Sequence, residues 1–313
     1  MVGSVEDRRI RALRGPKVGV DPWQEPRSIL DRERRPGGRV EQALTVFLTG
    51  AECPFTCLFC DLWRYTLDQP TPPGALPSQL EATLRRHRSV ALDRVKLYNA
   101  SNFFEQSAVP REDLDALATA VARFPAVTVE THARTVGAPT AEFAARIGGR
   151  LEVAIGLESV HPDVLPRLNK KMTVADFDRA AAFLLERGIE LRAFVLVGAP
   201  FLTGPEAVDW AVRTATHAIE AGAAVVALIP ARGGNGAMDR LRDRGEFVPP
   251  TLTALEDALD RCLELGPGVV TADLWDLDRL TSCALCASSR AARLARLGLT
   301  GRPEPRVRCD ACG

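Results

Sequence analysis

The chain has 313 residues, of which 46% are hydrophobic and 26% are charged, as in an ordinary folded globular protein. Its 40 basic and 40 acidic residues balance, so net charge alone indicates neither a nucleic-acid partner nor an anionic membrane surface. No apolar run is long enough to span a bilayer, and residues 1–14 lack the apolar core of a signal peptide. We therefore expect a cytoplasmic protein without a membrane-bound part, built as one large α/β domain with extensions.

The beginning of the chain changes character near residue 41. Residues 1–40 combine many charged residues with scattered prolines and glycines and have no sustained apolar period, which predicts an irregular N-terminal extension. From Ala43 the pattern becomes an apolar strand, Ala-Leu-Thr-Val-Phe-Leu-Thr, which leads directly into a loop with three cysteines. Because α/β sheets place their ligands beyond the carboxyl ends of strands, this loop lies where a site is expected.

The cysteine loop reads Cys53-Pro-Phe-Thr-Cys57-Leu-Phe-Cys60, a C-x3-C-x2-C spacing. A cubane iron–sulfur cluster takes four cysteines when fully ligated, so three thiolates would leave one iron open. An open coordination position is typical of a metal site that does chemistry rather than one that holds a fold. The alternative is a zinc or disulfide knot, although a run of three cysteines after a strand is rarer than paired C-x2-C turns.

Strands and helices then alternate along the chain. The expected strands are 94–98, 127–131, 151–157, 190–197 and 223–229, and the expected helices are 114–123, 141–147, 174–187 and 206–221. Thr173 with Asp176 marks a helix start, and Gly188 and Gly222 mark helix ends. Together with the strand from Ala43, six βα units result, which require right-handed crossovers and a parallel sheet. Six strands are too few to close an eight-stranded barrel, so we expect an open partial (β/α)6 barrel with a lateral mouth over residues 41–270.

The cysteine spacing, with Phe59 directly before the last cysteine, resembles the signature of the radical S-adenosylmethionine (SAM) superfamily. The resemblance implies an enzyme in which Cys53, Cys57 and Cys60 hold a 4Fe–4S cluster and the free iron chelates the amino and carboxylate groups of SAM. It also implies that an electron from the cluster splits SAM to a 5′-deoxyadenosyl radical. An external electron donor of the flavodoxin or ferredoxin type would supply that electron.

Polar residues at the ends of three later strands suit SAM. The segment after the second strand occupies the place where superfamily members usually carry a glycine-rich stretch, so the resemblance implies contacts from Asn99, Ala100, Ser101 and Asn102. An ordinary strand-to-helix turn is the alternative for this segment.

The third strand ends in Glu130, His132 and Arg134. A carboxylate can accept two hydrogen bonds from ribose hydroxyls, and a guanidinium can bind both oxygens of the SAM carboxylate. We therefore expect Glu130 and Arg134 to contact SAM, with a surface ion pair as the alternative. His132 is as consistent with a local hydrogen bond as with a proton donor.

The fourth strand ends in Gly156-Leu-Glu158-Ser, and Asn169-Lys170 follows. This stretch resembles the radical SAM branch that contains the elongator acetyltransferase and the tRNA methylthiotransferases. A glutamate that ends an apolar strand is costly unless it is paired, so we expect Glu158 to face the cavity. Asn169 and Lys170 are expected to contact the nucleoside or the substrate, with helix capping as the alternative.

Several segments in order resemble the radical SAM subunit of archaeosine synthase over residues 40–313, namely 97–105, 151–158, 169–170, 194–201 and 206–207. Members of that family act on a lysine-bearing deazaguanine in tRNA and cleave a carbon–nitrogen bond to leave a formamidine. The resemblance thus makes a modified tRNA base the specific substrate hypothesis. A small metabolite, peptide or lipid is the enzymatic alternative, because one radical generator serves many substrates.

Residues 271–313 contain the last motif, Cys283-Ala-Leu-Cys286 and Cys309-Asp-Ala-Cys312. Two C-x2-C turns can complete a tetrahedron of thiolates, so we expect a metal-binding segment that holds zinc or a second iron–sulfur cluster. The arginines between the turns suit RNA phosphates or form a solvated helical face: Arg290, Arg293, Arg296, Arg302, Arg306 and Arg308.

Cys262 is expected to be a buried helix residue without a metal role. A nucleic-acid or partner-binding module with purely structural metal sites is the non-enzymatic alternative to a radical SAM enzyme. The sequence identifies neither a catalytic side chain nor an oligomeric state.

Overall fold

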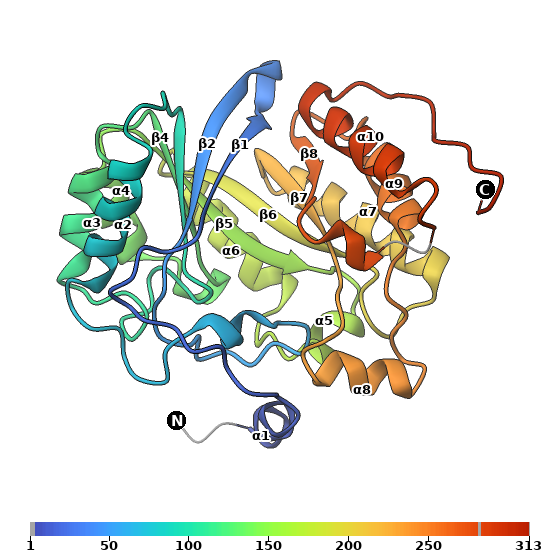
Figure 1. Cartoon of the computed structure of the whole chain (residues 1–313), viewed down its shortest axis with the longest axis horizontal. Helices are drawn as coiled ribbons and strands as arrows, with labels where there is room; N and C mark the ends of the chain where they lie inside the picture. The colour runs from blue at the N-terminus through green and yellow to red at the C-terminus, as the bar shows by residue number, and fades with distance from the viewer. Residues whose placement is uncertain (1–3, 281–282, 313) are drawn as a thin grey trace.

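The computed structural model describes residues 4–280 and 283–312. Its eight strands form one sheet in sequence order, curved into a nearly closed barrel with helices outside it (Figure 1). β1 is antiparallel to β2, and each later neighbouring pair is parallel. The strands are β1 (Ser28–Arg34), β2 (Val40–Phe47), β3 (Arg94–Tyr98), β4 (Ala126–Glu130), β5 (Arg150–Glu158), β6 (Glu190–Val197), β7 (Val225–Pro230) and β8 (Val269–Ala272).

Helical crossovers join the parallel strands, as strands that run in the same direction require. The α-helices are α1 (Val5–Ala12), α2 (Ala75–Arg86), α3 (Asp113–Val121), α4 (Ala138–Arg146), α5 (Val164–Arg167), α6 (Val174–Leu185), α7 (Gly204–Glu220), α8 (Ala237–Asp243), α9 (Leu252–Cys262) and α10 (Ala287–Thr300). Short 3-10 helices are η1 (Pro36–Gly38), η2 (Leu62–Tyr65), η3 (Ala133–Thr135) and η4 (Leu277–Leu280). Within the described residues, no helix combines the length and the apolar character needed to cross a bilayer.

The signals for the start and the end of α6 are confirmed. The Asp176 backbone N–H donates to the Thr173 hydroxyl at 3.2 Å, and the Thr173 N–H donates to the Asp176 carboxylate at 2.7 Å. Gly188, which follows α6, and Gly222, which follows α7, have φ angles of 66° and 94°. This left-handed conformation, which glycine adopts most easily, ends each helix where the sequence predicts it.

The predicted partial barrel is confirmed, and the six predicted strands correspond to β2 through β7. The sequence does not predict the two edge strands. Residues 1–40 contain both α1 and β1, so this segment is more regular than its composition indicates. β1 is hidden because its inward residue Glu33 is charged yet buried, and β8 has only 4 residues, too few for a clear period. The segment boundaries at residues 41 and 271 stay a prediction.

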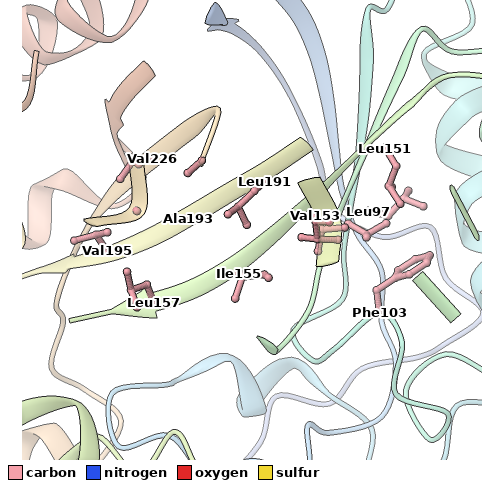
Figure 2. Packing of buried hydrophobic residues seen from close by; sticks show 14 of the residues in the cluster. Leu97, Phe103, Leu151, Val153, Ile155, Leu157, Leu191, Ala193, Val195 and Val226 are labelled. Atoms are coloured by element: carbon pink, nitrogen blue, oxygen red, sulfur yellow. The ribbon is translucent and has the colours of Figure 1, made fainter. Parts of the chain in front are cut away.

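Alternation along β5 separates an apolar outward face from inward positions that include charged residues. Leu151, Val153, Ile155 and Leu157 of β5 are buried in the main hydrophobic cluster, which also contains residues of α4, α6 and α7. Figure 2 shows these side chains beside those of Leu191, Ala193 and Val195 on β6. The intervening positions of β5, such as Glu152 and Glu158, therefore point into the barrel.

Near the amino ends of the strands, the barrel interior is filled by a network of ion pairs. Glu152 is fully buried and meets Arg35 at 2.6 Å, Arg192 at 2.9 Å and Arg94 at 3.6 Å. Burial alone would raise the pKa of Glu152, but these guanidinium groups hold it well below its usual range. The other members, which pair within the same network, are Glu33, Glu41, Lys96 and Glu190. We call this network the ionic floor, because it closes the barrel at the end opposite the cysteine loop.

Replacing Glu152 with glutamine is expected to destabilise the fold by about 3–5 kcal/mol, because three buried guanidinium groups lose the carboxylate between them. Urea unfolding followed by circular dichroism measures the change. The matched control is Glu81→Gln, which breaks an exposed pair with Arg85 and should cost less than about 1 kcal/mol. Equal unfolding midpoints for the two variants would contradict a structural role for the ionic floor.

Candidate active site

The cysteine loop follows β2 at the carboxyl-end rim of the barrel and is held from several sides. The Leu58 N–H donates to the Leu168 carbonyl at 2.9 Å. Asn235, buried on the loop after β7, donates its side-chain amide to the Leu58 carbonyl at 2.9 Å and to the Cys60 carbonyl at 3.2 Å. Sequence reasoning did not identify Asn235. Its signal is the run Gly-Gly-Asn-Gly over residues 233–236, shortly after the predicted strand 223–229, where site residues are expected.

The three loop cysteines are free and suit a metal cluster. Burial raises the pKa of Cys53, Cys57 and Cys60 to about 12 each, so the thiolate forms need a bound cation to compensate for lost hydration. Three thiols are one fewer than a fully ligated cubane cluster takes, so such a cluster held by this loop would keep one open iron.

The segment after β3 faces the cysteine loop and keeps polar atoms without partners. Asn102 is buried and donates its amide to the Cys53 sulfur at 3.2 Å, so it contacts the first cysteine of the loop. The Asn99 side-chain nitrogen and the Ser101 hydroxyl are buried but have no hydrogen-bond partner among the described residues. Ala100 between them adopts a left-handed φ of 52°. Buried polar atoms usually form hydrogen bonds, so unpaired ones fit a site where a ligand supplies the partner. The residues present here therefore fit SAM bound beside the loop.

Glu130, at the end of β4, contacts the segment after β3. The half-buried Glu130 accepts a hydrogen bond from the Asn99 backbone N–H at 3.2 Å. Burial raises the pKa of Glu130 to about 7, although the N–H groups of Asn99 and Ala100 oppose the shift. Arg134 is exposed on η3 and donates to the Lys171 carbonyl at 3.2 Å. Their contacts to SAM stay a prediction, as do those of Asn99, Ala100 and Ser101.

His132 is placed as a local hydrogen-bonding residue. Its ring stacks on Phe55 of the cysteine loop, with centroids 4.0 Å apart, and its Nε2 contacts the Lys170 carbonyl at 2.9 Å. Burial and the nearby Lys170 ammonium lower the pKa of His132 to about 3. The imidazole is therefore neutral at physiological pH and packs against the loop as a flat surface.

Glu158 faces the interior, as its position at the end of an apolar strand predicts, and pairs with buried Lys170 at 2.7 Å. The register of β5 against β6 shifts between Gly156 and Glu158, and Glu158 has a φ of 65°. A Cβ at Gly156 would lie 2.0 Å from the Glu158 carboxylate and 2.5 Å from the Lys170 ammonium, so a side chain there would displace this ion pair. Lys170 thus carries a positive charge beside Cys57 and Cys53, whose thiolates it favours.

Asn169 links the cysteine loop to α1 by hydrogen bonds. Its amide donates to the Thr56 carbonyl at 2.8 Å, to the Thr56 hydroxyl at 3.0 Å and to the Asp7 carboxylate at 2.8 Å. Asp7 belongs to α1, so the N-terminal helix is tied to the loop through this amide. Sequence reasoning did not identify Asp7, because one carboxylate in a charged segment gives no signal. A nucleoside contact from Asn169 would have to use other atoms and stays a prediction.

A pocket of about 570 Å³ opens beside the cysteine loop and is lined by Cys53 itself. Three of its lining residues, Arg11, Arg14 and Lys17, are basic, and one, Glu52, is acidic. Glu52 pairs with Arg14 at 2.6 Å and with Lys17 at 2.9 Å. The pocket therefore has a positive balance and suits an anionic group close to the loop.

The C-terminal cysteines Cys283, Cys286, Cys309 and Cys312 form a compact group, as the paired C-x2-C turns predict. Most of the arginines between them are engaged within the protein. Arg290 and Arg293 are buried and pair with Glu256, Arg296 pairs with Glu304, and Arg306 pairs with Asp257 and Asp260. This pairing favours a structural role for them over phosphate binding. Cys262 is buried at the end of α9, as predicted.

Comparisons with known proteins agree with this geometry. No family model matches the chain. Archaeosine synthase subunit beta of Methanosarcina acetivorans is 24% identical over 303 residues, which cover 92% of this chain and 87% of that protein. An uncharacterized protein of Methanocaldococcus jannaschii is 20% identical over 73% of this chain and 66% of its own length.

Three solved structures have the same fold. Elp3 of Methanocaldococcus infernus, with an N-terminal deletion, superposes with a TM-score of 0.55 at 14% identity over 82% of this chain, which spans 63% of Elp3. A radical SAM methyltransferase of Sphaerobacter thermophilus gives 0.54 at 18% identity over 88% of this chain and 84% of its own. Methylornithine synthase gives 0.55 at 14% identity over 79% and 70%.

This chain combines that fold with three cysteines on the loop after its first parallel strand. The fold is thus that of Elp3, the radical SAM methyltransferase and methylornithine synthase, and the sequence is similar to archaeosine synthase subunit beta.

The raised pKa of Glu130 predicts a pH dependence of stability. The folded state binds this proton more tightly than the unfolded chain, so the stabilising contribution is present below pH 4.5 and is lost as the pH rises through about 7. Glu130→Gln keeps the acceptor for Asn99 but does not titrate. Urea midpoints measured across this range should therefore fall less steeply with pH in the variant than in the wild type. Parallel profiles for the two proteins would contradict the assignment.

Proposed function

We propose that Cys53, Cys57 and Cys60 hold a 4Fe–4S cluster and that the protein uses it to cleave SAM. The observation that carries this proposal is the cysteine loop at the rim of the barrel, facing the unpaired polar atoms of Asn99 and Ser101. When bound, the cluster and SAM supply a 5′-deoxyadenosyl radical that abstracts a hydrogen atom from the substrate. A flavodoxin- or ferredoxin-type donor in the cytoplasm provides the electron, which suits a chain whose eight cysteines are all free.

Different residues around the loop would hold the cluster and SAM. Asn102 fixes the Cys53 sulfur by a hydrogen bond, and Lys170 compensates the charge of the thiolates. Asn99 and Ser101 offer a donor and a hydroxyl to the polar end of SAM. Glu130 holds the backbone of that segment, and its free oxygen suits a ribose hydroxyl. The exposed guanidinium of Arg134 suits a carboxylate.

We infer that the substrate is a modified base in tRNA. The similarity to archaeosine synthase subunit beta supports this inference because it extends along 92% of the chain rather than along the cysteine loop alone. An RNA substrate also needs cations near the site, and the pocket beside Cys53 provides Arg11, Arg14 and Lys17. The paired arginines of the tail are less suited, since each would first have to leave a carboxylate partner.

Single alanine replacements of Cys53, Cys57 and Cys60 test the cluster. Each variant, reconstituted without oxygen, is expected to lose iron from this site and to release no 5′-deoxyadenosine from SAM after reduction, because the cluster loses a ligand. Iron analysis and chromatography of the products measure both effects. Cys262→Ala is the matched control, as this cysteine is buried in α9 and has no metal role. Turnover that survives any of the three loop variants would overturn the proposal.

A salt series of tRNA binding tests the substrate class. Arg11→Ala is expected to weaken tRNA binding and to lower the slope of log K against log salt by about 1, because one phosphate contact disappears. Arg296→Ala on the tail is the control and should leave the slope unchanged. A lower slope in Arg296→Ala but not in Arg11→Ala would move the RNA contact to the tail. Absence of salt-dependent binding would favour a small substrate.

A further inference from the structure

The four C-terminal sulfur atoms have the spacing of ligands to one metal ion. Cys283 and Cys309 have their sulfurs 3.7 Å apart, Cys286 and Cys312 have theirs 3.5 Å apart, and all four lie within 4.8 Å. With Zn–S bonds of about 2.3 Å, the edges of a regular tetrahedron measure about 3.8 Å. A disulfide needs about 2.05 Å, and a cubane cluster spreads its thiolates over four different irons. The spacing therefore fits a single tetrahedral ion.

A buried arginine supplies the charge that such a site needs. Four thiolates around Zn²⁺ leave a net charge of −2, which is costly to bury without a cation nearby. Arg290 is only 3% exposed and donates its Nε to the Cys286 sulfur at 3.2 Å. Its Nη1 donates to Glu256 of α9, which is 1% exposed. Arg290 thus connects the metal ligands to a helix that packs on the sheet.

The metal site lies at the start of α10, and this helix covers the gap in the barrel wall. β1 and β8 are the two edge strands of the sheet, and α10 packs against both of them (Figure 1). Leu294 and Leu297 of α10 are buried in the main hydrophobic cluster. At the other end of the helix, Arg34 of β1 donates its Nε to the Gly298 carbonyl at 3.3 Å.

We propose that Cys283, Cys286, Cys309 and Cys312 bind one zinc ion, and that this ion fixes α10 across the gap between β1 and β8. The sheet itself leaves this gap open, because its edge strands do not pair with each other in the described structure. The zinc ties the start of α10 to the chain end, while Arg290 ties it to α9. The site therefore closes the barrel wall and has no open coordination position for substrate.

Metal analysis of the Cys53→Ala, Cys57→Ala, Cys60→Ala triple variant tests the identity of the ion, because any thiolate-bound metal left in this protein belongs to the tail. We expect one zinc per chain, no iron and no colour. Replacement with Co²⁺ should give the intense visible bands of tetrahedral thiolate coordination. Iron with inorganic sulfide in this variant would overturn the proposal. The outcome does not depend on SAM cleavage, so it is separate from the proposed function.

Hydrogen exchange of the full chain with and without a zinc chelator tests the role of the ion. Removal of zinc should speed amide exchange in α10, β1 and β8, while α4, on a distant part of the barrel, keeps its protection. A Cys309→Ser, Cys312→Ser variant should reproduce this pattern without a chelator. Unchanged exchange in β1 and β8 after verified zinc loss would overturn the closing role.

The contribution of Arg290 is measured as zinc affinity by competition with a chromophoric chelator. Arg290→Met should weaken zinc binding about 10–100-fold, because the thiolates lose a charged hydrogen-bond donor. Arg290→Lys should restore part of the affinity, since the charge returns without the fork that reaches both Cys286 and Glu256. Arg296→Ala, which breaks an exposed pair with Glu304, should bind zinc as the wild type does. Equal affinities for all variants would remove Arg290 from the site.

Discussion

The shared direction of β2 through β8 is the constraint on which the site depends. Parallel strands bring all their carboxyl ends to one rim, so segments separated by more than a hundred residues meet there without direct pairing of their sequences. Cys53 follows β2, Asn102 follows β3, and Lys170 follows β5, yet Asn102 and Lys170 both act on Cys53. The chemistry of the loop is therefore set by its neighbours at the rim and not by the loop alone.

The barrel interior separates two kinds of polar environment along its axis. At the amino ends, the ionic floor pairs each buried charge, as the contacts of Glu152 and Arg94 illustrate. At the carboxyl ends, Asn99 and Ser101 keep unpaired atoms, and Ala100, Glu158, Asn169 and Lys171 adopt left-handed backbone conformations. Left-handed non-glycine residues cost free energy and persist only where their surroundings fix them. The rim therefore combines strained backbone with unpaired polar atoms, whereas the ionic floor has its charges paired. This contrast is consistent with a binding site at the rim.

The sequence predicted those parts of the structure that local patterns encode. Apolar periods predicted β2 through β7, and the spacing of the cysteines predicted the cysteine loop and the C-terminal group. The sequence did not predict β1, because its inward Glu33 pairs with Lys96 and Arg192, which lie far away in sequence. The sequence did not identify Asp7 and Asn235 either, because a single polar residue forms no periodic pattern and its partners lie far away in sequence. The tail arginines looked like a cationic surface because Glu256, Asp257 and Asp260, which neutralise them, belong to a different helix.

The two groups of cysteines differ in a way that suits separate tasks in one reaction. The loop offers three thiols, of which Cys53 lines a pocket, whereas the tail offers four sulfurs at tetrahedral spacing beside the buried Arg290. An organic radical must be kept from water and from side reactions, so the proposed radical chemistry would need a closed barrel wall. The sheet cannot provide that wall, because its strands end at β1 and β8 without meeting. The proposed zinc site would fix α10 across that opening, so the C-terminal cysteines would help to confine the proposed reaction at the rim.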